Sequence, residues 1–276
     1  MEKIAGANGS TLIVSILLPL SYVSLVQLFD YNGTNRNEEK SIRKRFFGAI
    51  LSNLASISIT YYYLKDEVSS PFLEMGIRFD HIGEAISYPM TLGFSLYFGQ
   101  FVMMYIDRTI HYYFDIDEWK RSFRSLQWIR DIIVGPITEE IAFRCCSAVL
   151  MNRCLGAKWT LFCAPLPFAI SHFHHIFDDQ RRGHSLAHSI LQRTFQFCYT
   201  FVFGLFVTHL MLTTRHFIVP IVAHMICNSQ GLPLYWAVGN YPNRRDRFIL
   251  YISYTAGLLL CIYQLKSQHG MPTPNF

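Results

Sequence analysis

Charged side chains are scarce in this chain of 276 residues. Asp, Glu, Lys and Arg together make up 16% of it, whereas soluble domains contain about 25%. Hydrophobic residues make up 51% and aromatic residues 16%. The apolar residues are gathered in runs close to the length of about 20 residues that a helix needs to cross a bilayer. This composition argues against a soluble protein with long buried helices and favours an integral membrane protein.

Eight apolar runs are candidate transmembrane helices. The first three and the sixth are clean, the fourth, fifth and seventh carry polar residues, and the last is short. Together they predict an all-α, polytopic membrane bundle of about eight helices that forms one domain over residues 1–276. The runs are Thr11–Phe29, Phe46–Leu64, Ile86–Ile106, Trp128–Met151, Trp159–Phe177, Thr194–Leu212, Phe217–Trp236 and Phe248–Tyr263.

Several familiar signatures of enzymes are also missing. The chain has no HExxH zinc motif, no GxSxG nucleophile elbow, no Walker A loop and no GxGxxG in a supporting context. Its seven cysteines form no CxxC pair, and most lie inside the predicted spans. We interpret them as buried thiols that pack as small apolar groups. The remaining candidates for chemistry are the polar residues inside the apolar runs.

Positive charges are distributed unevenly over the predicted connections. The loops after the first, third, fifth and seventh runs hold fifteen Lys and Arg, against seven in the two tails and the other loops. Because positive loops stay in the cytosol, the loops after the odd-numbered runs are expected there, with both termini in the lumen. A positive cytosolic face against anionic lipid accounts for the net charge of +5 without a nucleic-acid partner.

Two adjacent glutamates, Glu139 and Glu140, lie inside the fourth run. A carboxylate at membrane depth costs roughly 2.5 to 3.5 kcal/mol and rarely faces lipid, so the pair indicates a functional site in a water-filled cavity. Glu140 and Arg144 share a helix face and could form an ion pair. Adjacent helical residues are rotated by about 100 degrees, so we expect one glutamate to face water and the other to bind Arg144. The alternative is an ion-paired helix junction without chemistry. Gly135-Pro136 would kink or start the helix just upstream.

The fifth run ends in histidines. Phe168 and His172 are one turn apart on one helix face. His172, His174 and His175 suggest a metal cluster, but the first two point about 200 degrees apart on a helix, which disfavours joint chelation. We interpret His174 and His175 as ordinary residues of the membrane border.

The seventh run contains a second polar pair. His224 and Asn228 are four residues apart and share a helix face. A single buried histidine is more often a satisfied core group than a catalyst. An asparagine on the same face of a lipid-embedded helix favours a site, because both side chains need polar partners there. The glutamates and His172 are the partners that we expect.

In chain order, the polar motifs are Glu139-Glu140-x-x-x-Arg144, Phe168-x-x-x-His172 and His224-x-x-x-Asn228. The set resembles the type II CAAX prenyl endopeptidases, within the wider family of CAAX proteases and bacteriocin-processing enzymes. The resemblance spans residues 139–228, about a third of the chain. It implies removal of the last three residues, aaX, from proteins whose CAAX cysteine carries a farnesyl or geranylgeranyl group. Ras-type small GTPases are such substrates. It also implies the endoplasmic reticulum membrane, with the site open to the cytosol.

Four residues are predicted to carry this reaction. Peptide hydrolysis needs an activated water, a stabilised oxyanion and a proton for the leaving amine. We expect Glu139 to be the general base and His172 to share or orient the water. His224 and Asn228 are expected to donate hydrogen bonds to the oxyanion.

Three residues are predicted to support the site. Glu140 paired with Arg144 would hold it in shape, and Phe168 belongs to the same set through the second motif. The assignment of the base between Glu139 and Glu140 stays open at this stage.

Two alternatives remain beside the metal-free protease. Glu139, His172 and His224 could ligate zinc, with water in the fourth position. A non-catalytic membrane scaffold or transporter could also use buried charges, although their clustering in three motifs argues against it. The expected partners are prenylated CAAX-tail proteins and the lipid bilayer, with no nucleic acid and no cofactor.

Overall fold

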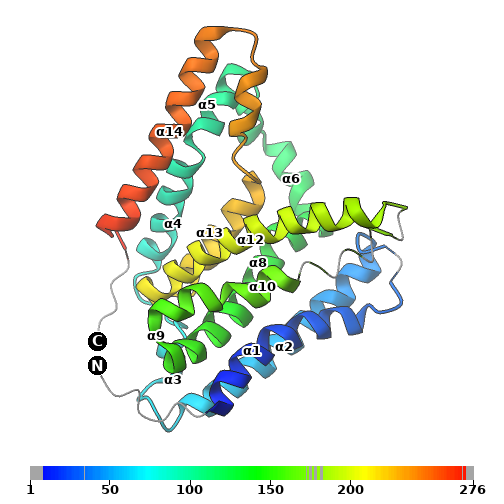
Figure 1. Ribbon diagram of the computed structural model, residues 1–276, viewed down its shortest axis with the longest axis vertical. Helices are drawn as coiled ribbons and strands as arrows, with labels where there is room; N and C mark the ends of the chain where they lie inside the picture. Colours follow the sequence, from blue (N-terminus) through cyan, green and yellow to red (C-terminus); the bar gives the residue numbers. More distant parts are fainter. Residues whose placement is uncertain are drawn as a thin grey trace. The chain divides into compact units, whose positions relative to one another are not determined.

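The computed structural model shows a helical chain (Figure 1). The described residues form α-helices, short 3-10 helices and π-helical segments but no strand, which confirms the predicted all-α class. Among the residues that the structure describes, three helices are long and apolar enough to cross a membrane: α1 (Gly9–Phe29), α12 (Leu186–Thr214) and α14 (Arg244–Ser267). The chain is thus a helical membrane protein, while the number of about eight spans stays a prediction. The described residues are 9–33, 35–171, 173, 176, 179–180, 183–268 and 270–271.

The chain forms two compact units, and each is built from two separate stretches of sequence. The first unit comprises Met1–Phe79 and Ile137–Pro220, and the second comprises Asp80–Pro136 and Ile221–Phe276. The first two motifs therefore belong to the first unit and the third motif to the second. The expected single domain over residues 1–276 stays a prediction.

In the first unit, α1 packs along α2 (Glu39–Leu64) (Figure 1). The side chains of Tyr22 and Ala49, one from each helix, join Phe143 in an apolar cluster. Burial of such side chains removes apolar surface from contact with water or lipid headgroups and fixes how the helices meet. The other helices of this unit include α12, α3 (Pro71–Glu74), α9 (Val149–Cys163) and α10 (Pro165–Ser171).

A buried carboxylate fastens the connection between α1 and α2. Asp30 follows the last residue of α1, is 4% exposed and accepts hydrogen bonds from Ser41 and from Arg45 Nε. Burial by itself raises the pKa of Asp30. The hydrogen bonds from Ser41 and Arg45, with the charges of Arg45 and Lys44, outweigh burial and leave this pKa below its ordinary value. The carboxylate of Asp30 is therefore ionised while it holds this connection together.

The segment that carries the glutamates is helical from residue 126 to residue 155. Gly156, with φ 74° and ψ 165°, interrupts α9 in a conformation that favours glycine. This break lies between the fourth and fifth predicted runs, where the sequence predicts a connection. In order, the elements are α7 (Leu126–Ile129), the π-helical segments η2 (Arg130–Val134) and η3 (Ile141–Ala148) on either side of α8 (Gly135–Glu140), and then α9.

In the second unit, α14 packs against α4 (Ile82–Leu96) and α5 (Phe98–Ile106) (Figure 1). The third predicted run is bent, because α4 ends before Tyr97 and α5 begins after it. Tyr97 Oη donates to the carbonyl of Gly231 at 2.7 Å, which ties this bend to the end of α13. The other elements are η1 (Ile110–Phe114), α6 (Ile116–Arg124), α13 (Ile218–Gln230), whose first turn belongs to the first unit, and η5 (Tyr235–Asn240).

Two glycines allow α14 to approach α4 and α5 closely. A Cβ atom at Gly99 would lie 2.2 Å from the ring of Tyr254, and one at Gly257 would lie 2.4 Å from the carbonyl oxygen of Ser95. Small residues at such positions are the usual means by which membrane helices come into contact.

We predict that Gly99→Leu lowers the stability of the purified protein in detergent by about 1–3 kcal/mol, because the added side chain overpacks the contact with Tyr254. Thermal unfolding monitored by circular dichroism measures the effect. Gly83→Ala is the matched control, since nothing lies within 4 Å of a Cβ at that helical position. Equal melting temperatures for Gly99→Leu and the wild type would contradict the packing described for α5 and α14.

Candidate active site

The first motif contains a fully buried ion pair. Arg144 Nη1 lies 3.2 Å from Glu140 Oε1, and their side chains are 1% and 0% exposed. The pair forms as the spacing of four residues predicts. Removing two charges from water is expensive unless they satisfy each other. Glu140 and Arg144 are therefore bound to one another as a structural unit.

Two aromatic rings cover the guanidinium of Arg144. Its Cζ lies 5.0 Å from the ring centroid of Phe168 and 5.8 Å from that of Phe143. The two rings meet edge to face, with centroids 5.1 Å apart. A cation over an aromatic face gains electrostatic attraction, and more of it where water is excluded. Phe168, predicted only as a member of the second motif, thus holds Arg144 from α10.

Glu139 has a different environment from its neighbour. Its side chain is partly exposed, whereas that of Glu140 is buried. The neighbouring Thr138 hydroxyl is 2.9 Å from Tyr22 Oη, and Tyr22 lies within electrostatic range of Glu139. Tyr22 could not be predicted from a sequence motif, because it is 116 residues away from Thr138. Of the two glutamates, Glu139 is the one that can face water.

The two glutamates lie between two widened stretches of helix. The amide of Gly135 donates to the carbonyl of Arg130, five residues earlier, which is the hydrogen bond of a π-helix. A Cβ at Gly135 would lie 2.8 Å from that carbonyl oxygen. Pro136 has no amide hydrogen to offer. The helix does not start at Gly135-Pro136, because it runs through from α7 and η2 into α8 without a break. The hydrogen-bond pattern changes there instead, and π-helical turns of this kind are frequent at functional sites.

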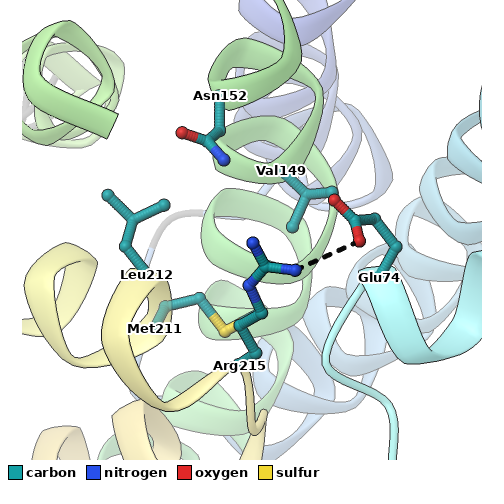
Figure 2. Close-up of a pocket in the computed structure, with 6 residues that line it drawn as sticks. All are labelled: Glu74, Val149, Asn152, Met211, Leu212 and Arg215. Atoms are coloured by element: carbon teal, nitrogen blue, oxygen red, sulfur yellow. Dashed lines mark hydrogen bonds and ion pairs between the residues drawn. The ribbon is translucent and has the colours of Figure 1, made fainter. Parts of the chain in front are cut away.

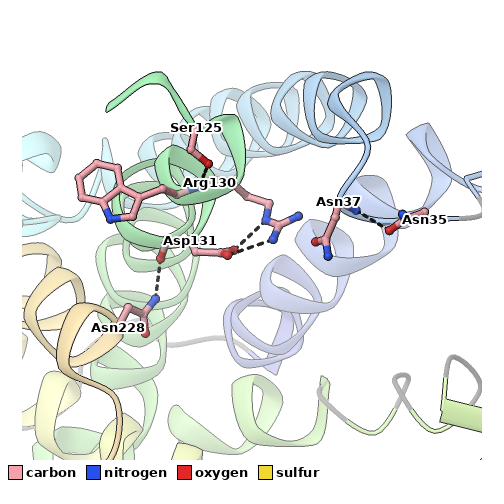
Figure 3. Close-up of polar contacts among 7 residues, drawn as sticks. Asn35, Asn37, Ser125, Arg130, Asp131 and Asn228 are labelled. Atoms are coloured by element: carbon pink, nitrogen blue, oxygen red, sulfur yellow. Dashed lines mark hydrogen bonds and ion pairs between the residues drawn. The ribbon is translucent and has the colours of Figure 1, made fainter. Parts of the chain in front are cut away.

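The third motif lies on α13 in the second unit. His224 is 3% exposed, and Asn228 is exposed. Asn228 Nδ2 donates to the carbonyl oxygen of Asp131 at 2.9 Å (Figure 3). The carboxylate of Asp131 in turn accepts from Arg130 Nε at 2.7 Å and from Nη2 at 3.0 Å. This backbone contact orients the asparagine amide, and no residue type in the sequence could have indicated it.

The C-terminal end of α13 is fixed by hydrogen bonds from the same unit. Gln100 Nε2 donates to the carbonyl of Gln230 at 3.1 Å. Tyr113 Oη donates to Gln230 Oε1 at 2.8 Å. Together with the contact between Tyr97 and Gly231, these bonds hold the turn of helix that follows Asn228.

His172, His174 and His175 lie outside the described residues. Among the residues that the structure describes, no three His, Cys, Asp or Glu form a group that could hold a metal ion. The zinc alternative includes His172, so it stays a prediction, as does the metal-free mechanism.

A pocket in the first unit is separate from these motifs (Figure 2). Arg215 ends α12 in a left-handed conformation with φ 46°, and its Nη1 lies 3.5 Å from Glu74 Oε2. The pocket contains none of the predicted catalytic residues. Its lining residues are Glu74, Val149, Asn152, Met211, Leu212 and Arg215.

The first unit thus contains a buried charged pair and a partly exposed glutamate, and the second a buried histidine. Polar groups of this kind in a helical membrane protein indicate a functional role. A family model described as type II CAAX prenyl endopeptidase Rce1-like matches residues 121–230, which include all three motifs. No solved structure matches the chain.

Curated relatives extend this match over most of the chain. CAAX prenyl protease 2 of Caenorhabditis elegans is 60% identical over 262 residues, covering 95% of this chain and 98% of that protein. CAAX prenyl protease 2 of Homo sapiens is 29% identical over 259 residues, covering 90% and 78%. Probable CAAX prenyl protease 2 of Schizosaccharomyces pombe is 37% identical over 142 residues, covering 49% and 50%. The chain therefore belongs to the family of type II CAAX prenyl endopeptidases and is a membrane hydrolase.

We predict that Arg144→Met destabilises the protein by about 3–5 kcal/mol, because it leaves the charge of Glu140 buried without its partner. The double variant Glu140→Leu/Arg144→Met should recover most of this loss, since no buried charge remains. Denaturant titration in detergent, followed by tryptophan fluorescence, measures both.

The matched control is the solvent-exposed pair Glu39 and Arg43, which has the same spacing of four residues and a separation of 3.8 Å. Glu39→Leu/Arg43→Met and Arg43→Met should leave the unfolding midpoint unchanged. If Arg144→Met proved as harmless as Arg43→Met, the buried pair would not have the structural role given to it here.

Proposed function

We propose that this endopeptidase removes the aaX tripeptide from prenylated CAAX proteins by means of a water molecule that Glu139 activates. The observation that carries the proposal is the contrast between the two adjacent glutamates. Glu140 is fully buried against Arg144, and Glu139 keeps part of its side chain exposed. A general base must reach a water molecule, so Glu139 takes this role and Glu140 a structural one.

The reaction then follows from the four catalytic residues. Glu139 accepts a proton from water, with His172 orienting that water, and the oxygen bonds to the scissile carbonyl carbon. His224 and Asn228 donate hydrogen bonds to the resulting oxyanion. As the C–N bond breaks, the proton held by Glu139 passes to the leaving amine. The products are a prenylcysteine carboxylate and a free tripeptide.

Asn228 is suited to this role by its contact with Asp131. A side-chain amide carries two N–H donors on one nitrogen. One of them is directed at the carbonyl of Asp131 at 2.9 Å, which fixes the plane of the amide. The second donor is then available to an oxyanion without any reorganisation of the side chain. Preorganised donors of this kind supply the largest share of stabilisation in acyl transfer.

Glu140, Arg144 and Phe168 act through position. The guanidinium of Arg144 lies over the ring of Phe168 on α10, so rotation of the helix about its axis would break this contact and expose a buried charged pair. Glu139 is attached to the same turn, so its direction is fixed as well.

The substrates that fit this chemistry are prenylated CAAX-tail proteins, including Ras-type small GTPases. Their lipid chain would enter from the bilayer between apolar helices, and the peptide would enter from the cytosolic side. The positive loops predicted to be cytosolic support this orientation. We place the enzyme in the endoplasmic reticulum membrane, as the family resemblance implies.

We predict that Glu139→Gln lowers kcat by about 10²- to 10⁴-fold, because it removes the general base. KM should change little and the melting temperature should match the wild type. Release of the tripeptide from a farnesylated CAAX peptide by protein in lipid measures the loss. Glu140→Gln is the comparison variant, and it should lose melting temperature together with activity.

A zinc chelator added to the wild type separates the two mechanisms. Activity that survives chelation agrees with water activated by Glu139 alone. Loss of activity that zinc restores would replace the proposed mechanism with the zinc-dependent one. Undiminished kcat in Glu139→Gln would remove Glu139 from the chemistry altogether.

We also predict that Asn228→Leu lowers kcat by about 10²- to 10³-fold, the usual effect of deleting one oxyanion donor. Ser229→Ala serves as the neighbouring control, since Ser229 is exposed and its hydroxyl donates to the carbonyl of Ile226 within the helix. The same peptide assay applies. A variant Asn228→Leu with normal kcat and raised KM would show that the asparagine binds substrate in the ground state instead.

A further inference from the structure

We propose that α6 is an interfacial helix that lies in the headgroup layer of the bilayer and sets the depth of the contact between Asp131 and Asn228. This inference rests on the proposed function only in the role given to Asn228. The occupant of its apolar face would be the phospholipid of the membrane that the protein itself spans.

The residues of α6 separate into two faces. Ile116, Trp119 and Phe123 follow the helical spacing of three and four residues, and they are 68%, 42% and 55% exposed. Asp117 and Arg121 lie on the opposite face. Large apolar side chains are seldom left in water as a contiguous stripe. A short helix with one aromatic face and one charged face is the form that lies in the plane of a membrane surface.

Aromatic rings extend this face along the chain. The rings of Trp119 and Phe123 are 6.0 Å apart, and the ring of Trp128 lies 4.9 Å from that of Phe123. Trp119 Nε1 donates to the carbonyl of Tyr113 at 2.8 Å, so its polar atom is satisfied by the protein. Phe114, just before the helix, is 80% exposed. Tryptophan and other aromatic residues gather at the interface between membrane and water.

The charged face is nearly neutral. Lys120 Nζ lies 2.9 Å from Asp117 Oδ1, and Arg121 Nη2 lies 2.5 Å from Glu118 Oε1. Within each pair the positive and negative charges cancel, so Arg124 is the excess cation of the helix. The apolar face, and not attraction to anionic lipid, must then provide the binding. A neutral polar face also agrees with a position among zwitterionic headgroups.

α6 is connected without a long loop to Asp131, the residue that contacts Asn228 of the third motif. Asp115 caps its start by accepting from the amide of Asp117 at 2.9 Å. Ser125 Oγ accepts from the amide of Trp128 at 3.2 Å and so begins α7 directly after α6 (Figure 3). η2 then continues to Asp131, whose carbonyl holds Asn228. No long loop intervenes, so a change in the depth of α6 would move this contact as well.

Brominated lipids test the position of α6. The full-length protein is reconstituted in phosphatidylcholine brominated near the glycerol end or near the methyl end of the acyl chain. Subtracting the emission of Trp119→Phe from that of the wild type isolates Trp119. We expect this emission to be lost mainly with bromine near the glycerol end. Emission unaffected by either lipid would overturn the proposal and indicate a protein cover on this face.

Activity in two environments tests the consequence. In a bilayer, the double variant Ile116→Ser/Phe123→Ser should cleave the farnesylated peptide several-fold more slowly than the wild type. In detergent micelles the two proteins should be equally fast, because a micelle has no flat headgroup layer in which α6 must lie. The control Asp117→Ser/Lys120→Ser makes the same number of changes on the charged face and should be active in both. Equal activity of the apolar-face variant in bilayers would overturn the depth-setting role. If the wild type itself proved inactive, the proposed function would fail while the quenching result still decided the place of α6.

Discussion

The buried ion pair between Glu140 and Arg144 is the constraint on which the rest of the first unit depends. At 3.2 Å and with almost no exposure, neither charge can be released without leaving the other in an apolar interior. Next to the pair, Tyr22 of α1 and Phe168 of α10 pack against Phe143 in one apolar cluster. Helices that are distant in sequence therefore meet at the turn that carries the pair. Because Glu139 is next to Glu140 on the same helix, its side chain leaves the helix in a direction that this packing determines. The difference in burial between the two neighbouring carboxylates is therefore a consequence of packing.

The same reasoning explains why an enzyme can keep ionised groups inside a membrane protein. A catalytic carboxylate needs water, and a structural carboxylate needs a cation and no water. Neighbouring residues of a helix point about 100 degrees apart, so two adjacent carboxylates can have different surroundings. In the second unit, the contact of Asn228 with the carbonyl of Asp131 likewise holds one N–H donor of its amide in place.

Much of this could be predicted from the sequence, and the exceptions have physical reasons. The spacing of Glu140 and Arg144 predicts their pair. The gap between the fourth and fifth runs predicts a connection, and the structure has its break there, at Gly156. The bend at Tyr97 was missed because the run around it is continuously apolar. The contribution of Tyr22 depends on long-range packing, and that of Asp131 on a backbone carbonyl, neither of which leaves a residue-type signal. The proposed assignment of the base to Glu139 depends on the different burial of the two glutamates. Two identical neighbours in a sequence do not show which of them is buried.

The central claim is that Glu139 activates water and does not itself attack the substrate. A single turnover in water labelled with heavy oxygen tests it most directly, with mass spectrometry of the product and of the peptide containing Glu139. We predict that the new prenylcysteine carboxylate carries the label after the first turnover and that Glu139 remains unlabelled. An unlabelled product together with label in the Glu139 carboxylate would show a covalent acyl-enzyme and contradict the account.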